Sequence, residues 1–132
     1  GLIGAAVTSV PGASAAYLGG VVSYATPLKA VLAGVPDQIL QLHGPVSAET
    51  AAAMATGVRA LTDADWGLSA TGVAGPDPQD GHAPGEVWIG VAGPRTGPLA
   101  ERIDCVGDRE AIRTAAVVAA LNLLLRQLAL NP

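Results

Sequence analysis

The stretch EVWIGVAGPRTGPLAERIDCV, residues 86–106, decides the fold class of this 132-residue chain. Its apolar runs, residues 86–92 and 99–106, predict two strands, and the intervening GPRTG is typical of a hairpin. Asp108 follows directly and is expected to cap a long final helix, because an aspartate side chain accepts hydrogen bonds from the free N–H groups at a helix start. The stretch therefore predicts an antiparallel pair of strands followed by a helix.

Upstream of this stretch, apolar segments and turn signals alternate. We expect a buried strand over residues 66–73 and a short β-type run over residues 21–24. Helices are expected over residues 1–10, 27–32, 38–42 and 48–61. Thr26 and Ser47 are expected to cap two of the helices, with Pro27 at a first helical position. Helices that alternate with strands predict a three-layer α/β/α domain with a mixed sheet.

Composition narrows the class of protein. Half of the residues are hydrophobic and 14% are charged, which excludes general disorder. No apolar run reaches the roughly 18 residues of a membrane span. A net charge of −4 without a basic cluster argues against nucleic acid. The single cysteine, Cys105, excludes an internal disulfide and fits a reducing cytoplasm, so we expect one cytoplasmic domain over residues 1–132 with no membrane or nucleic-acid partner.

The chain opens on Gly1 within a helical pattern and without methionine. We expect it to begin inside the fold, with an N-terminal strand and loop missing. The long apolar final helix and the alanine-rich faces favour a homodimer.

Lys29 is the one lysine beside six arginines. A desolvated lysine can lose its proton and act as a base, which arginine cannot do. If Thr26 caps its helix, Lys29 lies in the first turn, where the helix dipole and apolar surroundings would lower its pKa. The alternative is a surface lysine whose stem covers apolar residues.

Two hydroxyl-bearing residues lie near Lys29 in sequence. Ser14 follows Pro-Gly-Ala in a tight loop that predicts an exposed, well-defined hydroxyl, although such loops also make ordinary helix caps. Tyr24 ends the β-type run, and the alternative for it is a core tyrosine with a satisfied hydroxyl. Together the three residues form a candidate hydrolytic trio.

A glycine-containing loop, residues 71–76, follows the predicted buried strand. Its glycines allow backbone N–H groups to approach a ligand, and Thr71 adds a hydroxyl. Arg109, at the start of the final helix, is suited to a phosphate, although a solvated arginine is equally compatible with that position. His43 and His82 are far apart in sequence and have no carboxylates at ligand spacing, so no metal site is expected.

Successive blocks of the chain resemble the CinA C-terminal domain family in order and spacing. They are Pro11-Gly12-Ala13-Ser14, Gly19-Gly20-Val21-Val22-Ser23-Tyr24, Lys29, Leu32-Ala33-Gly34-Val35-Pro36, His43-Gly44-Pro45-Val46-Ser47, Thr71-Gly72-Val73-Ala74-Gly75-Pro76, Gly85-Glu86-Val87-Trp88-Ile89-Gly90 and Gly107-Asp108-Arg109. The resemblance covers essentially the whole chain.

Members of this family with demonstrated activity hydrolyse the carboxamide of nicotinamide mononucleotide without metal or cofactor. The resemblance implies a Ser/Lys amidohydrolase in which Ser14 is the nucleophile, Lys29 its base and Tyr24 a hydrogen-bonding partner. It implies that substrate, a small nucleotide, is bound by Thr71, Gly72, Ala74, Gly75 and Arg109.

The chain departs from the family pattern in three places. The family usually has Ala-Glu-Ser-x-Thr-Gly-Gly before the first helix here, and that loop contributes a serine and backbone N–H groups to the pocket. Thr26 stands where many members have asparagine, and residues 77–85 lack the usual glycine run. Two other functions stay open: a non-catalytic nucleotide-binding or oligomerisation domain of a two-domain protein, and an amidase for a different small amide.

Overall fold

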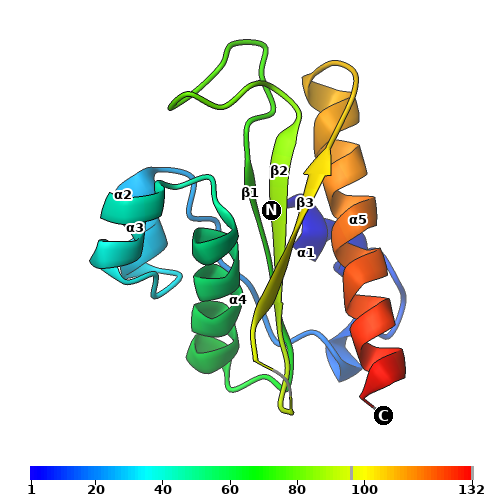
Figure 1. Cartoon of the computed structure of the whole chain (residues 1–132). Helices are drawn as coiled ribbons and strands as arrows, with labels where there is room; N and C mark the ends of the chain where they lie inside the picture. The colour runs from blue at the N-terminus through cyan, green and yellow to red at the C-terminus, as the bar shows by residue number, and fades with distance from the viewer. Residues whose placement is uncertain (96, 132) are drawn as a thin grey trace.

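The computed structural model describes residues 1–95 and 97–131 and has three layers. A central sheet is covered on one face by α4 (Ala48–Thr62) and on the other by α5 (Arg109–Leu130) (Figure 1). Outside these helices, α1 (Leu2–Thr8) packs against α5, and α3 (Asp37–His43) packs against α4. The predicted three-layer α/β/α class is therefore confirmed.

The sheet consists of β1 (Gly67–Gly72), β2 (Glu86–Ala92) and β3 (Leu99–Asp104), hydrogen-bonded in that order. Both strand pairs are antiparallel, so no parallel pair of the expected mixed sheet occurs within the described part of the chain. The reason is that no helix connects consecutive strands here, and a parallel pair requires a long crossover. The hairpin predicted over residues 93–97 includes residue 96, which lies outside the described residues.

The face of the sheet that meets α5 holds the larger hydrophobic core. Alternate residues of β2 point to this face, as expected for a strand with one side-chain repeat every two residues. Three residues of α5 complete the cluster, which consists of Val87, Ile89, Val91, Ile112, Ala120 and Leu123. By length and composition alone α5 could also cross a membrane, a test that the core helix of a soluble protein passes as well.

The opposite face meets α4 at much closer range. A Cβ atom on Gly90 would lie 2.2 Å from the carbonyl oxygen of Ala51, and one on Gly67 would lie 2.0 Å from that of Ala55. The hydroxyl of Ser69 donates a hydrogen bond of 2.6 Å to the Ala51 carbonyl. Small residues therefore let the α4 backbone lie directly on the strands, which fixes the position of the segments that precede α4.

The predicted caps of the two long helices are confirmed. Ser47 accepts a hydrogen bond from the backbone N–H of Thr50 at the start of α4. Asp108 does the same for Ala111 at the start of α5. The second cap matters for the site, because it places Arg109 in the first turn of α5 at the end of the sheet where β1 ends.

Two predictions in the N-terminal third were wrong in detail. Residues 21–24 form no strand, and Val22 and Tyr24 are exposed. Residues of β-type composition form a strand only where a neighbouring strand can pair with them. The short helix α2 (Thr26–Val31) has Ala25, not Thr26, at its N-cap. Between α1 and this segment the chain makes one turn of 3-10 helix, η1 (Ala13–Ala15).

Candidate functional site

Lys29 is a buried lysine, with 8% of its surface exposed. It lies in α2, and its Nζ atom donates a hydrogen bond of 3.0 Å to the backbone carbonyl of Ser23. Burial lowers the pKa of the Lys29 amine, because the charged form loses its hydration. A lysine in this environment is closer to the neutral, proton-accepting form than a surface lysine.

The sequence argument for this shift was half right. Lys29 was expected in the first turn of its helix, where the dipole would help, but α2 has six residues and Lys29 lies in its last turn. A helix end affects charges only within its own first or last turn, and the C-terminal end favours a cation. Burial is therefore the cause of the lowered pKa.

A second group of contacts connects Tyr24, Gly75 and Arg109. The Nη1 atom of Arg109 donates to the Gly75 carbonyl at 2.8 Å, and its Nη2 atom donates to the Tyr24 hydroxyl at 3.2 Å. Tyr24 is 81% exposed, so this is not the core tyrosine of the alternative interpretation. Because Tyr24 follows Ser23, the acceptor of Lys29, four of the predicted site residues belong to one connected arrangement.

The other predicted binding residues of the loop have structural contacts. Thr71 is buried and its hydroxyl donates to the Pro45 carbonyl. A Cβ on Gly72 would lie 2.6 Å from the Glu86 carbonyl, so the adjacent strand already requires glycine there. Ala74 packs against the core on the α5 face. A binding role for these three residues stays a prediction.

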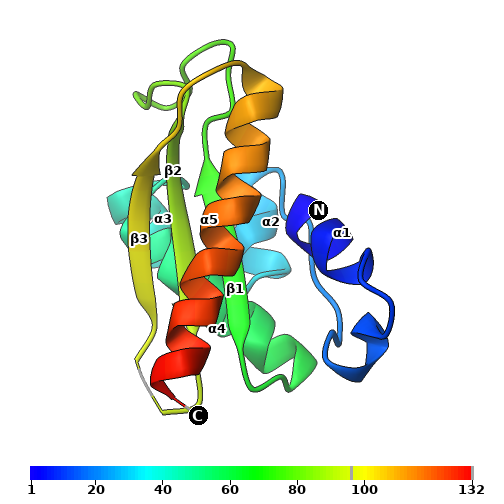
Figure 2. The same cartoon turned by 90° about the vertical axis from the view of Figure 1, so that its right-hand side faces the viewer.

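Ser14 is not brought together with Lys29 in this chain. It is exposed in η1, which follows α1 on the α5 side of the sheet. The segment after α2 packs through Ala33 and Val35 against Met54 of α4, on the other side. Figures 1 and 2 show the two segments apart in both views, with η1 in blue beyond the end of α1.

An apolar groove of about 830 Å³ lies beside this region without including it. It runs between the α2–α3 segment and the outer surface of α4, and Val31, Ile39 and Gly57 are among its lining residues. None of the predicted site residues lines it. Its walls lack the convergent polar groups that a nucleotide requires, so we do not place the substrate there.

Two features of the site had little or no signal in the sequence. The first is the carbonyl of Ser23, since a backbone acceptor leaves no trace in residue types. The second is a polar cluster on the loop side of the sheet, in which Glu86 is paired with His82. Among residues 1–95 and 97–131, no group of three histidine, cysteine or acidic side chains is arranged to hold a metal ion.

Comparison with known proteins gives one consistent match. The model of the family described as CinA C-terminal domain matches residues 1–128. A CinA-like protein of Frankia casuarinae is 52% identical over 129 residues, which are 98% of this chain and 30% of that protein. The chain therefore spans less than a third of the length of this relative.

Solved structures agree with the match. The competence damage-inducible protein A of Klebsiella pneumoniae is 32% identical, with a TM-score of 0.91 over 98% of this chain and 80% of that one. The competence/damage inducible protein CihA of Agrobacterium tumefaciens is also 32% identical, with a TM-score of 0.89 over 96% of this chain and 78% of its own. Both the sequence and the arrangement of elements are thus shared.

Proposed function

Because this chain belongs to the CinA C-terminal domain family, we propose that its candidate site hydrolyses an amide, with the carboxamide of nicotinamide mononucleotide as substrate. The observation that carries the proposal is the buried Lys29 amine with its lowered pKa. A neutral amine is what a Ser/Lys hydrolase needs as its base, and burial is a recognised way to obtain one. No cofactor is required by this chemistry.

The reaction proceeds in two balanced halves. Neutral Lys29 takes the proton of a serine hydroxyl as its oxygen attacks the carboxamide carbon. The tetrahedral intermediate expels ammonia, which leaves with the proton from Lys29, and an acyl-enzyme remains. Water then repeats the sequence and releases nicotinate mononucleotide. Backbone N–H groups directed at the oxyanion would stabilise the intermediate, typically by about 3–4 kcal/mol per donor.

Arg109 is suited to hold the phosphate of this substrate. Guanidinium carries five N–H donors, and two of its nitrogen atoms here donate one hydrogen bond each, to Gly75 and Tyr24. Those two contacts fix its orientation, and the remaining donors are free to meet an anion in the planar geometry that phosphate prefers. Tyr24 then acts as a positioning residue through its contact with Arg109.

Within one copy of the chain, Ser14 does not lie beside Lys29, so it cannot act there as the nucleophile that Lys29 activates. The family resemblance assigns the attack to Ser14, and this assignment requires Ser14 of a second copy, in keeping with the expected homodimer. The same family carries a serine in the loop that leads into its first helix. In this chain that helix is α1, and its start lies close to the site: a Cβ on Gly1 would lie 3.5 Å from Val22, which directly precedes Ser23 and Tyr24.

The separation of Ser14 from Lys29 also favours a second candidate function. A domain that binds a nucleotide without hydrolysing it would need the Arg109 contacts and would have no use for a neutral lysine. The two functions therefore differ in what Lys29 does.

Release of ammonia from nicotinamide mononucleotide by the intact protein tests the proposal. We expect release by the parent protein and none above background in a Lys29→Arg variant, because arginine cannot supply a neutral base. Binding of the nucleotide without ammonia release would support the binding domain. Release of ammonia from another small amide, but not from nicotinamide mononucleotide, would support the proposed mechanism with a different substrate.

A further inference from the structure

The loop between β1 and β2, residues 73–85, carries Gly75. Backbone hydrogen bonds close its base, among them one of 2.8 Å from the Gly85 N–H to the Val73 carbonyl, and two side-chain contacts hold it as well. Near its start, Arg109 donates to the Gly75 carbonyl at 2.8 Å. Near its end, Nδ1 of His82 lies 3.0 Å from Oε2 of Glu86, the first residue of β2. The loop that touches the candidate site is therefore also held by a contact between His82 and Glu86 that the proposed mechanism does not use.

His82 is the residue of this contact that comes from the loop. It forms a tight turn with Gln79 through two backbone hydrogen bonds, of 3.0 and 2.9 Å. The contact of its imidazole with Glu86 therefore connects this turn to the start of β2. The side chain of His82 is 27% exposed and that of Glu86 is 13% exposed, so the contact is shielded without being cut off from bulk protons.

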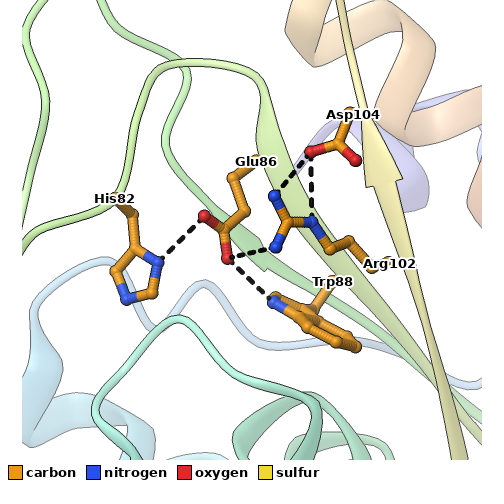
Figure 3. Close-up of polar contacts among 5 residues, drawn as sticks. All are labelled: His82, Glu86, Trp88, Arg102 and Asp104. Carbon is orange, nitrogen blue, oxygen red and sulfur yellow. Dashed lines mark hydrogen bonds and ion pairs between the residues drawn. The ribbon is translucent and has the colours of Figure 1, made fainter.

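Glu86 itself is held by the sheet independently of His82. Its Oε1 atom accepts from the indole N–H of Trp88 at 3.3 Å and lies 3.6 Å from Nη1 of Arg102, which in turn pairs with Asp104 (Figure 3). The hydrogen bond from His82 is the largest cause of a lowered pKa at Glu86, ahead of Trp88 and the nearby positive charges. Glu86 is thus a fixed anion to which the loop attaches.

We propose that His82 is a positioning residue that attaches the loop of residues 73–85 to Glu86 and thereby keeps Gly75 and Arg109 in place for substrate. This inference rests on the proposed function for the activity it affects. The Nδ1 atom of His82 lies within hydrogen-bond distance of the Glu86 carboxylate, and a hydrogen bond to an ionised acceptor is stronger than one between neutral groups.

The expected consequence is a substrate affinity that depends on this contact. In a His82→Ala variant, KM for nicotinamide mononucleotide should rise about three-fold, a size typical of a partly exposed pair of side chains. A His82→Asn variant keeps a donor near the position of Nδ1, so its KM should stay close to that of the parent. The turnover number kcat should change little in either variant, because Lys29 has no contact with this loop among the described hydrogen bonds.

A second readout does not depend on activity. Trp88 shares the Glu86 carboxylate with His82, so in a Trp66→Phe background its fluorescence should change when His82 is replaced by alanine. The change should be absent in His82→Asn, which keeps a donor, and in His43→Ala, which removes the exposed contact of His43 with Glu49.

The experiment separates failure of this proposal from failure of the proposed function. An unchanged KM in His82→Ala, or a fluorescence change that appears equally in His82→Asn, would overturn the positioning role. Absence of ammonia release from every variant would overturn the amidase proposal, and the fluorescence change alone would then decide whether His82 attaches the loop to Glu86.

Discussion

The short helix that carries Lys29 and the turn that carries Ser14 differ in what surrounds their functional atoms. Lys29 is almost fully buried and its amine is bonded to the Ser23 carbonyl, whereas Ser14 is exposed in η1 on the other side of the sheet. Burial changes the acidity of the first group, and nothing comparable acts on the second. The difference shows that one chain holds a lysine amine of lowered pKa at a defined position but does not place the Ser14 hydroxyl beside it.

The largest expected effect comes from replacing Lys29, the proposed base. Lys29→Met should lower kcat for ammonia release by about 10²–10⁴-fold, the usual contribution of a general base. Methionine fills a similar volume without a charge, so the circular dichroism spectrum should match that of the parent. Activity within ten-fold of the parent would contradict the role of Lys29.

Mixing two inactive variants sharpens the comparison. If Ser14 of one copy serves Lys29 of another, Ser14→Ala and Lys29→Met should each be inactive, and an equal mixture should recover about a quarter of the parent activity, since half of the dimers would contain one intact site of two. Full activity of Ser14→Ala would instead assign the attack to a different hydroxyl.

Substitution of Arg109 tests the contacts that connect Tyr24 to the loop of residues 73–85. Arg109→Lys keeps the charge but loses the planar donors, so KM should rise about ten-fold while kcat changes little. Arg113→Lys, on an exposed position of the same helix, is the matched control and should leave KM unchanged. An equal KM in the two variants would remove Arg109 from the binding site.

Stability should depend on pH through Lys29. Its pKa is lower in the folded state than in the unfolded chain, so the unfolded chain binds more protons between the two values, and the free energy of unfolding rises with pH across that interval. The destabilisation is complete below the folded pKa and absent above about pH 10.4, the ordinary value. Denaturant melts between pH 7 and 10.5 should show this rise in the parent and not in Lys29→Met.

The smallest effect is expected at the exposed turn. Ser14→Ala should change the free energy of unfolding by less than about 0.5 kcal/mol, as is usual for a surface substitution without buried contacts. Ser69→Ala is the contrasting variant, because it removes a buried hydroxyl that bonds the α4 backbone, and should cost about 1 kcal/mol or more. Equal losses in the two variants would mean that the Ser14 turn is packed more tightly than its exposure indicates.

The sequence predicted those parts of the structure that depend on local chemistry. Ser47 and Asp108 were recognised as caps because their residue types and positions suffice, and the strand that holds Trp88 was recognised from its apolar run. Residues 21–24 were misassigned because a strand also requires a partner, which composition does not reveal. The contacts of Lys29 with Ser23 and of Arg109 with Tyr24 join residues 6 and 85 positions apart, and only the fold brings them together.

The most direct test is the protonation of Lys29 itself. Because it is the one lysine in these 132 residues, incorporation of ¹³C-labelled lysine gives a single side-chain signal that can be followed by NMR as pH is raised. The Cε resonance should titrate clearly below about 10.4, the ordinary lysine pKa. Titration at or above that value would show a charged amine at neutral pH and would contradict its role as the base.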